Sequence, residues 1–203
     1  MKKEYFLIFA LLAVTGLLVG CSGSQVKRVP VEEVVDLSGR WNDTDSRLVA
    51  QEMIEDALSR PWLPEFHGSH NRSPVVIVGF IKNQSHEHIN SDIFTKDLER
   101  SLLNSGKIKF VASRDERGWV REERDDQNKT GYTNPETIKK IGKETGADFM
   151  VIGSVNSVKD EVKSRYVILY QVNLELVDIE TNEKVWIGQK DVKKVVKRSK
   201  YSL

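Results

Sequence analysis

Residues 165–178, RYVILYQVNLELVD, carry the sequence pattern that decides the fold. Every second residue of this stretch is apolar, namely Tyr166, Ile168, Tyr170, Val172, Leu174 and Leu176. A period of two places alternate side chains on opposite faces of a strand, so one face of this strand is expected to lie on a core. Tyr170, Leu174 and Leu176 are predicted to point inward.

The residues that follow predict a hairpin. Residues 180–183 (ETNE) are turn formers, and Val185, Trp186 and Ile187 form the next strand-like run. Two such runs joined by a short polar segment are typical of an antiparallel hairpin. Residues 190–200 are rich in lysine and are expected to form a solvated basic tail, with contact to anionic lipid or glycan as the alternative.

Two other stretches are near-continuous apolar runs, at 74–81 (PVVIVGFI) and 147–155 (ADFMVIGSV). Such runs predict strands that are covered on both faces. A shorter strand is expected at 107–112. The segment between 81 and 107 predicts a helix that opens at Ser91 and ends at Gly106, with an apolar face of Phe94, Leu98 and Leu102. Strand, helix and strand in this order predict a βαβ unit with a right-handed crossover.

A helix is expected to precede the first strand. Asp43 or Thr44 caps it, it runs to about Arg60, and its inward face consists of Leu48, Met53, Ala57 and Leu58. The two prolines of residues 61–64 end this helix. A loop that contains His67 and His70 is predicted to follow.

Two more helices are expected between the second and third strands. Ser113 and Glu116 form a capping box for a highly charged helix to Gln127, and Asn134 caps a helix that ends at Gly146. The complete order predicts an α+β or α/β fold. Its elements are a mixed five-stranded sheet with one βαβ unit, a C-terminal antiparallel hairpin and about four helices.

The N-terminus resembles a bacterial lipoprotein signal. Lys2 and Lys3 precede an apolar run at 5–20, which is shorter than the roughly 20 residues that a membrane-spanning helix needs. The ending Leu-Val-Gly-Cys resembles the lipobox, which implies lipid on Cys21 and cleavage before it. The alternative is an ordinary thiol. Ser22, where inner-membrane lipoproteins carry Asp, implies the outer membrane, with the globular domain in the periplasm.

These features divide the chain into a signal peptide at 1–20, a lipidated N-terminus and linker at 21–36, and one globular domain at 37–203. Without the signal peptide the chain has 29 basic and 29 acidic residues. This balance argues against a dedicated nucleic-acid binder, which would carry a basic excess. Cys21 is the only cysteine, so the domain has no disulfide.

No motif for catalysis, a cofactor or a metal stands out. The sequence has no P-loop, no Gly-x-Ser-x-Gly and no HExxH. His86 and His88 flank Glu87, but no third ligand has useful spacing, so a solvated loop is the favoured interpretation. The chain is predicted not to be an enzyme and to need no cofactor, although a hydrolase with residues from distant positions stays an alternative.

Residues 36–42, DLSGRWN, are the candidate for a partner interface. Trp and Arg are enriched among the residues that anchor interfaces, and Arg40 and Trp41 are adjacent here. Trp41 at the edge of the core is the alternative. Trp119, in the charged helix, is the third candidate, and a water-facing surface is the alternative for that helix.

Four segments together resemble the LpoB family of penicillin-binding protein activators, at 36–45 (DLSGRWNDTD), 75–83 (VVIVGFIKN), 146–153 (GADFMVIG) and 170–188 (YQVNLELVDIETNEKVWIG). The third segment also occurs in the curli-secretion lipoprotein family CsgG and in relatives of the TolB N-terminal domain.

The resemblance implies an outer-membrane lipoprotein that binds and stimulates a bifunctional peptidoglycan synthase, with no catalytic residues. Its best-known members have a longer, proline-rich linker, from which this sequence departs. A CsgG-like secretion channel is the alternative; it would need amphipathic segments of about 9–11 residues per membrane crossing.

Overall fold

A computed structural model describes residues 26–197. The predicted signal peptide and Cys21 lie outside these residues. Contacts divide the chain into residues 1–33 and a compact unit that begins at Val34, and the fold below is that of the second unit. In the first unit, residues 26–33 are exposed, and the Glu33 N–H donates to the Pro30 carbonyl over 3.1 Å.

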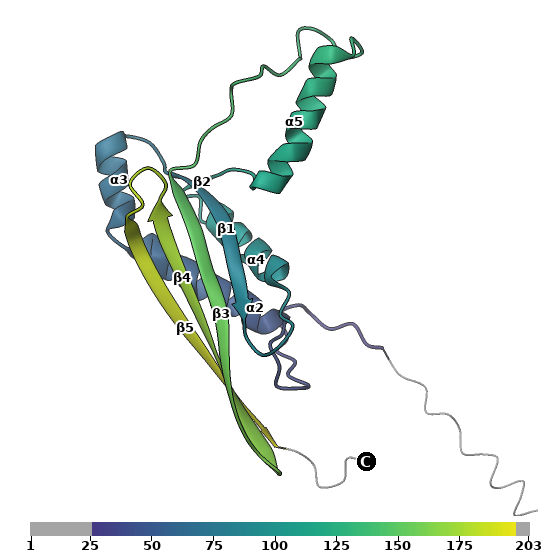
Figure 1. Ribbon diagram of the computed structural model, residues 1–203, viewed down its shortest axis with the longest axis vertical. Helices are drawn as coiled ribbons and strands as arrows, with labels where there is room; N and C mark the ends of the chain where they lie inside the picture. Colours follow the sequence, from purple (N-terminus) through teal and green to yellow (C-terminus); the bar gives the residue numbers. More distant parts are fainter. Residues whose placement is uncertain (1–25, 198–203) are drawn as a thin grey trace, which may run out of the picture. The chain divides into compact units, whose positions relative to one another are not determined.

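The second unit is built on one mixed five-stranded sheet (Figure 1), which confirms the predicted fold class. The spatial order is β2-β1-β3-β4-β5; β1 is parallel to β2 and β3, and the last three strands are antiparallel. The strands are β1 at Val75–Gln84, β2 at Lys109–Phe110, β3 at Phe149–Val162, β4 at Arg165–Asp178 and β5 at Lys184–Lys197.

The inward face of β4 is the centre of the core. Tyr170 and Leu174 are fully buried and Leu176 is 2% exposed, which confirms the predicted orientation of this strand. Ile168 and Val172, on the same face, are equally buried. Because β4 is paired along its whole length with β3 and β5, its register fixes the register of both neighbours.

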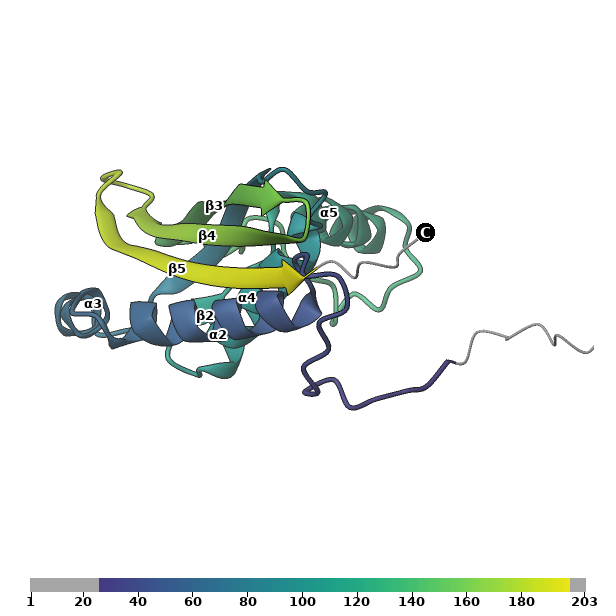
Figure 2. The same cartoon turned by 90° about the horizontal axis from the view of Figure 1, so that it is seen from below.

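Helices α2 (Asp43–Ser59) and α4 (Ser91–Asn104) cover one face of this sheet (Figure 2). The buried face of α4 is Phe94, Leu98 and Leu102, as predicted. The prediction for α2 was wrong in two details. Asn42 caps the helix in a box with Asp45, and Leu48 is 41% exposed because the inward stripe starts at Val49.

The prediction of a loop around His67 and His70 is wrong, because these residues belong to helix α3 (Trp62–His70). Pro61 lies at its N-cap and Pro64 in its first turn. A helix needs no N–H donor in its first turn, so neither proline interrupts it. Trp62, Leu63 and Phe66 are buried, and the rings of Trp62 and Phe66 meet Phe149 edge to face.

Helix α5 (Arg114–Lys129) begins with the predicted capping box of Ser113 and Glu116. The helix predicted at 134–146 is wrong. Gly142 has a φ of +76°, which is incompatible with a right-handed helix. Ile141 is 66% exposed, so it makes no core contact that would stabilise a helix here. Polar contacts with α5 hold this segment instead, including the pair between Arg121 and Glu144.

The predicted basic tail is also wrong for residues 190–197, which extend β5. Lys190 and Lys194 alternate with Val192 and Val196 on the inward side of β5, and the two lysines reach acidic residues of α2. At the other edge β2 is shorter than predicted, with only two residues paired to β1. Among residues 26–197, none of the helices has the length and apolar character to cross a membrane.

The first prediction concerns the core face of β4. Leu174→Ala removes a fully buried side chain and leaves a cavity, so it is expected to lower the free energy of unfolding by about 2–5 kcal/mol. Leu169→Ala, the same substitution on the opposite and half-exposed face, is the control and is expected to cost less than half as much. Chemical denaturation measures both, and equal losses would contradict the orientation of the strand.

The second prediction concerns the attachment of α5. The Glu116 carboxylate accepts from Lys96 Nζ over 2.6 Å and from the Ser113 N–H over 2.8 Å, and these bonds lower the pKa of Glu116 to about 2. A lowered pKa stabilises the fold above the ordinary value of 4.5, and this contribution disappears as the pH falls toward 2. An NMR titration should show Glu116 titrating near 2 and the α5 amides shifting with it.

Glu116→Gln is the control for that titration. Its amide can keep the capping box but does not titrate, so the step near pH 2 should vanish from the α5 signals that report Glu116. A Glu116 that titrates at its ordinary value would show that neither bond forms in solution.

Candidate functional site

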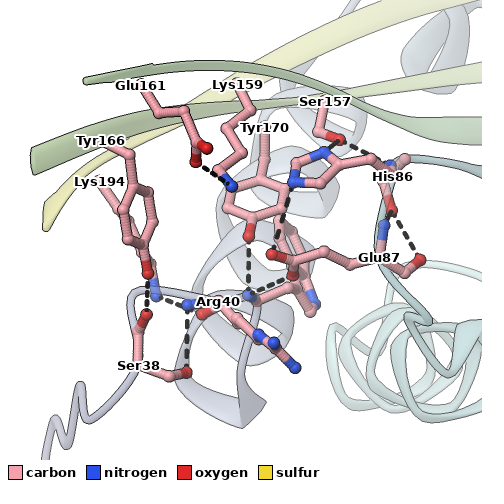
Figure 3. A network of polar contacts seen from close by, with 12 residues as sticks. Ser38, Arg40, His86, Glu87, Ser157, Lys159, Glu161, Tyr166, Tyr170 and Lys194 are labelled. Atoms are coloured by element: carbon pink, nitrogen blue, oxygen red, sulfur yellow. Dashed lines mark hydrogen bonds and ion pairs between the residues drawn. The ribbon is translucent and has the colours of Figure 1, made fainter. Parts of the chain in front are cut away.

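The segment that precedes α2, residues 36–42, attaches to the inner side of β4 and β5 (Figure 3). We call these residues the strap. They include Arg40 and Trp41, two of the three residues that the sequence indicates as a partner interface. The strap is held by an aromatic contact, a glycine turn and a partly buried ion cluster.

The aromatic contact is made by Trp41. Its ring meets Tyr170 and Phe94 edge to face, with centroids 5.5 and 6.2 Å apart. Its Nε1 donates to Ser46 Oγ over 2.7 Å, which satisfies the one polar atom of the indole. Trp41 is therefore half-buried at the edge of the core, one of the two alternatives for this residue.

The Trp41 backbone N–H is bound as well. It donates to the Tyr170 hydroxyl over 3.1 Å and to Glu87 Oε2 over 3.3 Å. Burial, followed by the hydrogen bond with Glu87, raises the pKa of Tyr170 well above its ordinary value. Tyr170 is therefore a neutral hydroxyl at any physiological pH. It is available to accept the bond from Trp41.

The turn of the strap is made at Gly39, which has a φ of +70°. A Cβ at this position would collide with the Val196 side chain of β5, so only glycine lets the backbone approach the sheet so closely. On the same side, the Tyr166 hydroxyl donates to the Ser38 carbonyl over 2.7 Å. The two contacts tie the strap to both C-terminal strands.

The ion cluster centres on Lys194 of β5. Its ammonium lies 2.6 Å from Asp36 Oδ1 and 2.6 Å from Asp45 Oδ2, and it donates to the Arg40 carbonyl over 3.1 Å. Burial lowers the pKa of Lys194, but the hydrogen bonds that its ammonium donates to both carboxylates outweigh burial and raise the pKa overall. The lysine is therefore charged and joins the strap, α2 and β5.

The three predicted interface residues do not form one site. Arg40 is exposed, and Figure 3 shows its side chain extending away from the network. Trp119 is 72% exposed on α5, which lies at the other end of the sheet from the strap (Figure 1). His86 and Glu87 belong to the loop beside the strap. Within residues 26–197, no three His, Cys, Asp or Glu side chains are placed to hold a metal ion.

Three members of this network are not predicted from the sequence as site residues, namely Glu87, Tyr170 and Lys194. A tyrosine in an alternating apolar strand did carry a signal, because a buried hydroxyl needs a partner. Lys194 lies in the predicted basic tail, but its alternation with Val192 and Val196 is the period of a strand and was the signal available in the sequence. The arrangement offers attachment rather than chemistry, since the Lys194 charge is matched and the buried hydroxyl is bonded.

Comparison with known proteins places the chain in a family. A family model described as peptidoglycan-synthase activator LpoB matches residues 45–192. Among curated proteins, none matches the chain significantly in sequence.

Solved structures give weak matches. The LpoB C-terminal domain from Salmonella enterica is 18% identical, with 73% of this chain and 98% of that chain covered and a TM-score of 0.44. The same domain from Escherichia coli is 17% identical, with the same coverage and a TM-score of 0.45. Lipoprotein GNA1162 from Neisseria meningitidis is 16% identical, with 60% and 83% covered and a TM-score of 0.38.

At these identities and TM-scores the structural matches carry no argument, so the assignment rests on the family model. That model starts inside α2, ends inside β5 and covers well over half of the chain. The family resemblance is thereby confirmed, and the match includes the segments at 75–83, 146–153 and 170–188, whereas the segment at 36–45 precedes it except for Asp45. The chain belongs to the LpoB family of peptidoglycan-synthase activators.

Proposed function

We propose that this protein is a lipoprotein of the outer membrane, anchored through Cys21, whose periplasmic domain binds and stimulates a bifunctional penicillin-binding protein. The observation that carries the proposal is the family match over residues 45–192, because the family is one of regulatory activators. The lipobox-like ending at Cys21 and the serine at position 22 support the anchor. The proposal assigns the chain no catalytic activity of its own.

An activator of this kind works through differential binding. It accelerates the synthase only if it binds the faster conformation of the enzyme more tightly than the slower one. A difference of about 1–3 kcal/mol changes the equilibrium by 5- to 150-fold. The domain must therefore present a well-defined surface, and it needs no reactive group.

We propose Arg40, Trp41 and Trp119 as contact residues on this surface. Arg40 and Trp119 are exposed and free to bind a partner, and both types are enriched in interface hot spots. Trp41 is half-buried, so only part of its ring is open to a partner. Its substitution therefore acts on the fold as well as on any interface.

The third prediction concerns the anchor. Cys21→Ser removes the thiol that would receive lipid, so the precursor should remain uncleaved or unlipidated. It should then no longer fractionate with the outer membrane. Metabolic labelling with a fatty acid, together with membrane fractionation, measures both effects. A variant that matures and localises like the wild type would show that Cys21 is not the anchor.

The fourth prediction tests the activator itself. The mature chain should raise the glycan-polymerising or crosslinking rate of the bifunctional synthase from its own cell, and it should not hydrolyse peptidoglycan alone. As proposed contact residues, Arg40 and Trp119 should each lower the affinity for the synthase tenfold or more when replaced by alanine, without changing thermal stability. Titration calorimetry and a synthase assay measure the two effects.

Two matched variants control for general surface effects. Tyr132→Ala removes another exposed aromatic ring, and Arg114→Ala removes another exposed arginine. Both should bind the synthase like the wild type.

Trp41→Ala should lower the free energy of unfolding by about 2 kcal/mol, because it removes a half-buried ring. If the wild-type chain neither binds nor stimulates the synthase, the proposed function is wrong.

A further inference from the structure

The sheet has a free end where β3 turns into β4 (Figure 1). Ile168 and Tyr170 of β4 point inward here, so Val167 and Leu169 point to the opposite, outer side. Their register partners on β3 and β5 share that side. We call the outer side of β3 158–162, β4 165–169 and β5 193–197 the arm face.

The arm face is rich in uncovered aliphatic side chains. Val158, Val162 and Val195 are 68%, 57% and 61% exposed, and Val167 and Leu169 between them are half-buried. The register places these residues in adjacent rows across three strands. Such a continuous apolar strip on a surface is typical of an interaction site rather than of scattered exposure.

Cations border this strip. Lys193 is the register partner of Leu169, and Arg165 and Lys197 are partners of each other one row from the turn. All three are exposed, and within residues 26–197 none of them forms an ion pair. Asp160 is the one carboxylate on the face. The arm face is thus amphipathic and positively charged, whereas the mature chain as a whole is formally neutral.

The chain that leads to Cys21 leaves the domain at this same end. The strap lies on the inner side of the arm, where Asp36 binds Lys194 and Gly39 contacts Val196. Only residues 22–35 separate the strap from Cys21, and fourteen residues span at most about 50 Å. A lipid on Cys21 would therefore hold the arm within 50 Å of a membrane surface.

From these observations we propose that the arm face binds the anionic phospholipid surface of the membrane that holds the lipid on Cys21. The argument from tether length rests on the proposed anchor, whereas the composition of the face does not. Aliphatic side chains insert at the boundary between headgroups and acyl chains, and the flanking cations bind anionic headgroups. The tether keeps the local concentration of lipid high, so a low affinity of the arm face for the membrane is sufficient.

Vesicle binding by the unlipidated chain tests this proposal separately from the anchor and from synthase activation. Every buried residue of the described domain lies between Thr44 and Trp186, so a chain of residues 22–203 keeps the whole core. Co-sedimentation with vesicles that contain phosphatidylglycerol gives a partition coefficient. Vesicles of pure phosphatidylcholine should bind far less.

The test variant is Arg165→Gln/Lys193→Gln/Lys197→Gln. Each cation near an anionic surface contributes about fivefold in partition, so the triple variant should bind about 100-fold more weakly. The control is Lys107→Gln/Lys109→Gln/Lys140→Gln, which removes the same charge from exposed positions elsewhere and should change binding less than fivefold.

Three results would overturn the proposal. The first is that the test variant binds vesicles as tightly as the wild type. The second is that the control variant loses as much vesicle binding as the test variant, which would show that net charge alone is responsible. The third is that the wild-type chain does not bind vesicles but binds soluble poly-glutamate through the same three cations. That result would make an acidic protein surface the occupant.

Discussion

The fold depends on the inward face of β4. Five of its side chains, from Ile168 to Leu176, are at most 2% exposed, and α2 and α4 are positioned to cover them. One of the five is Tyr170, whose hydroxyl lies at the edge of the covered area. Burial of a hydroxyl is unfavourable unless it is hydrogen-bonded, and the backbone of Trp41 supplies that bond. The core therefore dictates the position of the strap.

A stimulating protein needs a stable shape more than it needs chemistry. The strap meets that need, because its ion cluster joins three elements that come from distant parts of the chain. Helix α5 is attached differently. It has no buried residue and is held by polar contacts such as the one between Lys96 and Glu116. The exposed ring of Trp119 is thus carried by an element that contributes no buried side chain to the core.

Period and capping were sufficient to predict most of the fold from the sequence. The strict alternation of β4 and the capping box of α5 are local signals, and both were confirmed. The failures have physical causes. Pro64 lies in the first turn of α3, where a proline does not break a helix, and residues 134–146 have too few apolar side chains to stabilise a helix by packing. The network of Glu87, Tyr170 and Lys194 joins positions far apart in sequence, so no local pattern could reveal it.

The strap also determines how tension reaches the domain. A protein tethered at its N-terminus is pulled there whenever the two ends of the tether move apart. The pull first meets the bond between Asp36 and Lys194, then the Ser38 carbonyl on Tyr166, and only then the ring of Trp41. Because these contacts lie on β5 and β4, and Lys194 also binds Asp45 of α2, force entering through the strap is shared by the sheet and the helix. With the proposed anchor at Cys21, a pull on the N-terminus would load the contacts of the strap before it could unwind α2 from its first turn.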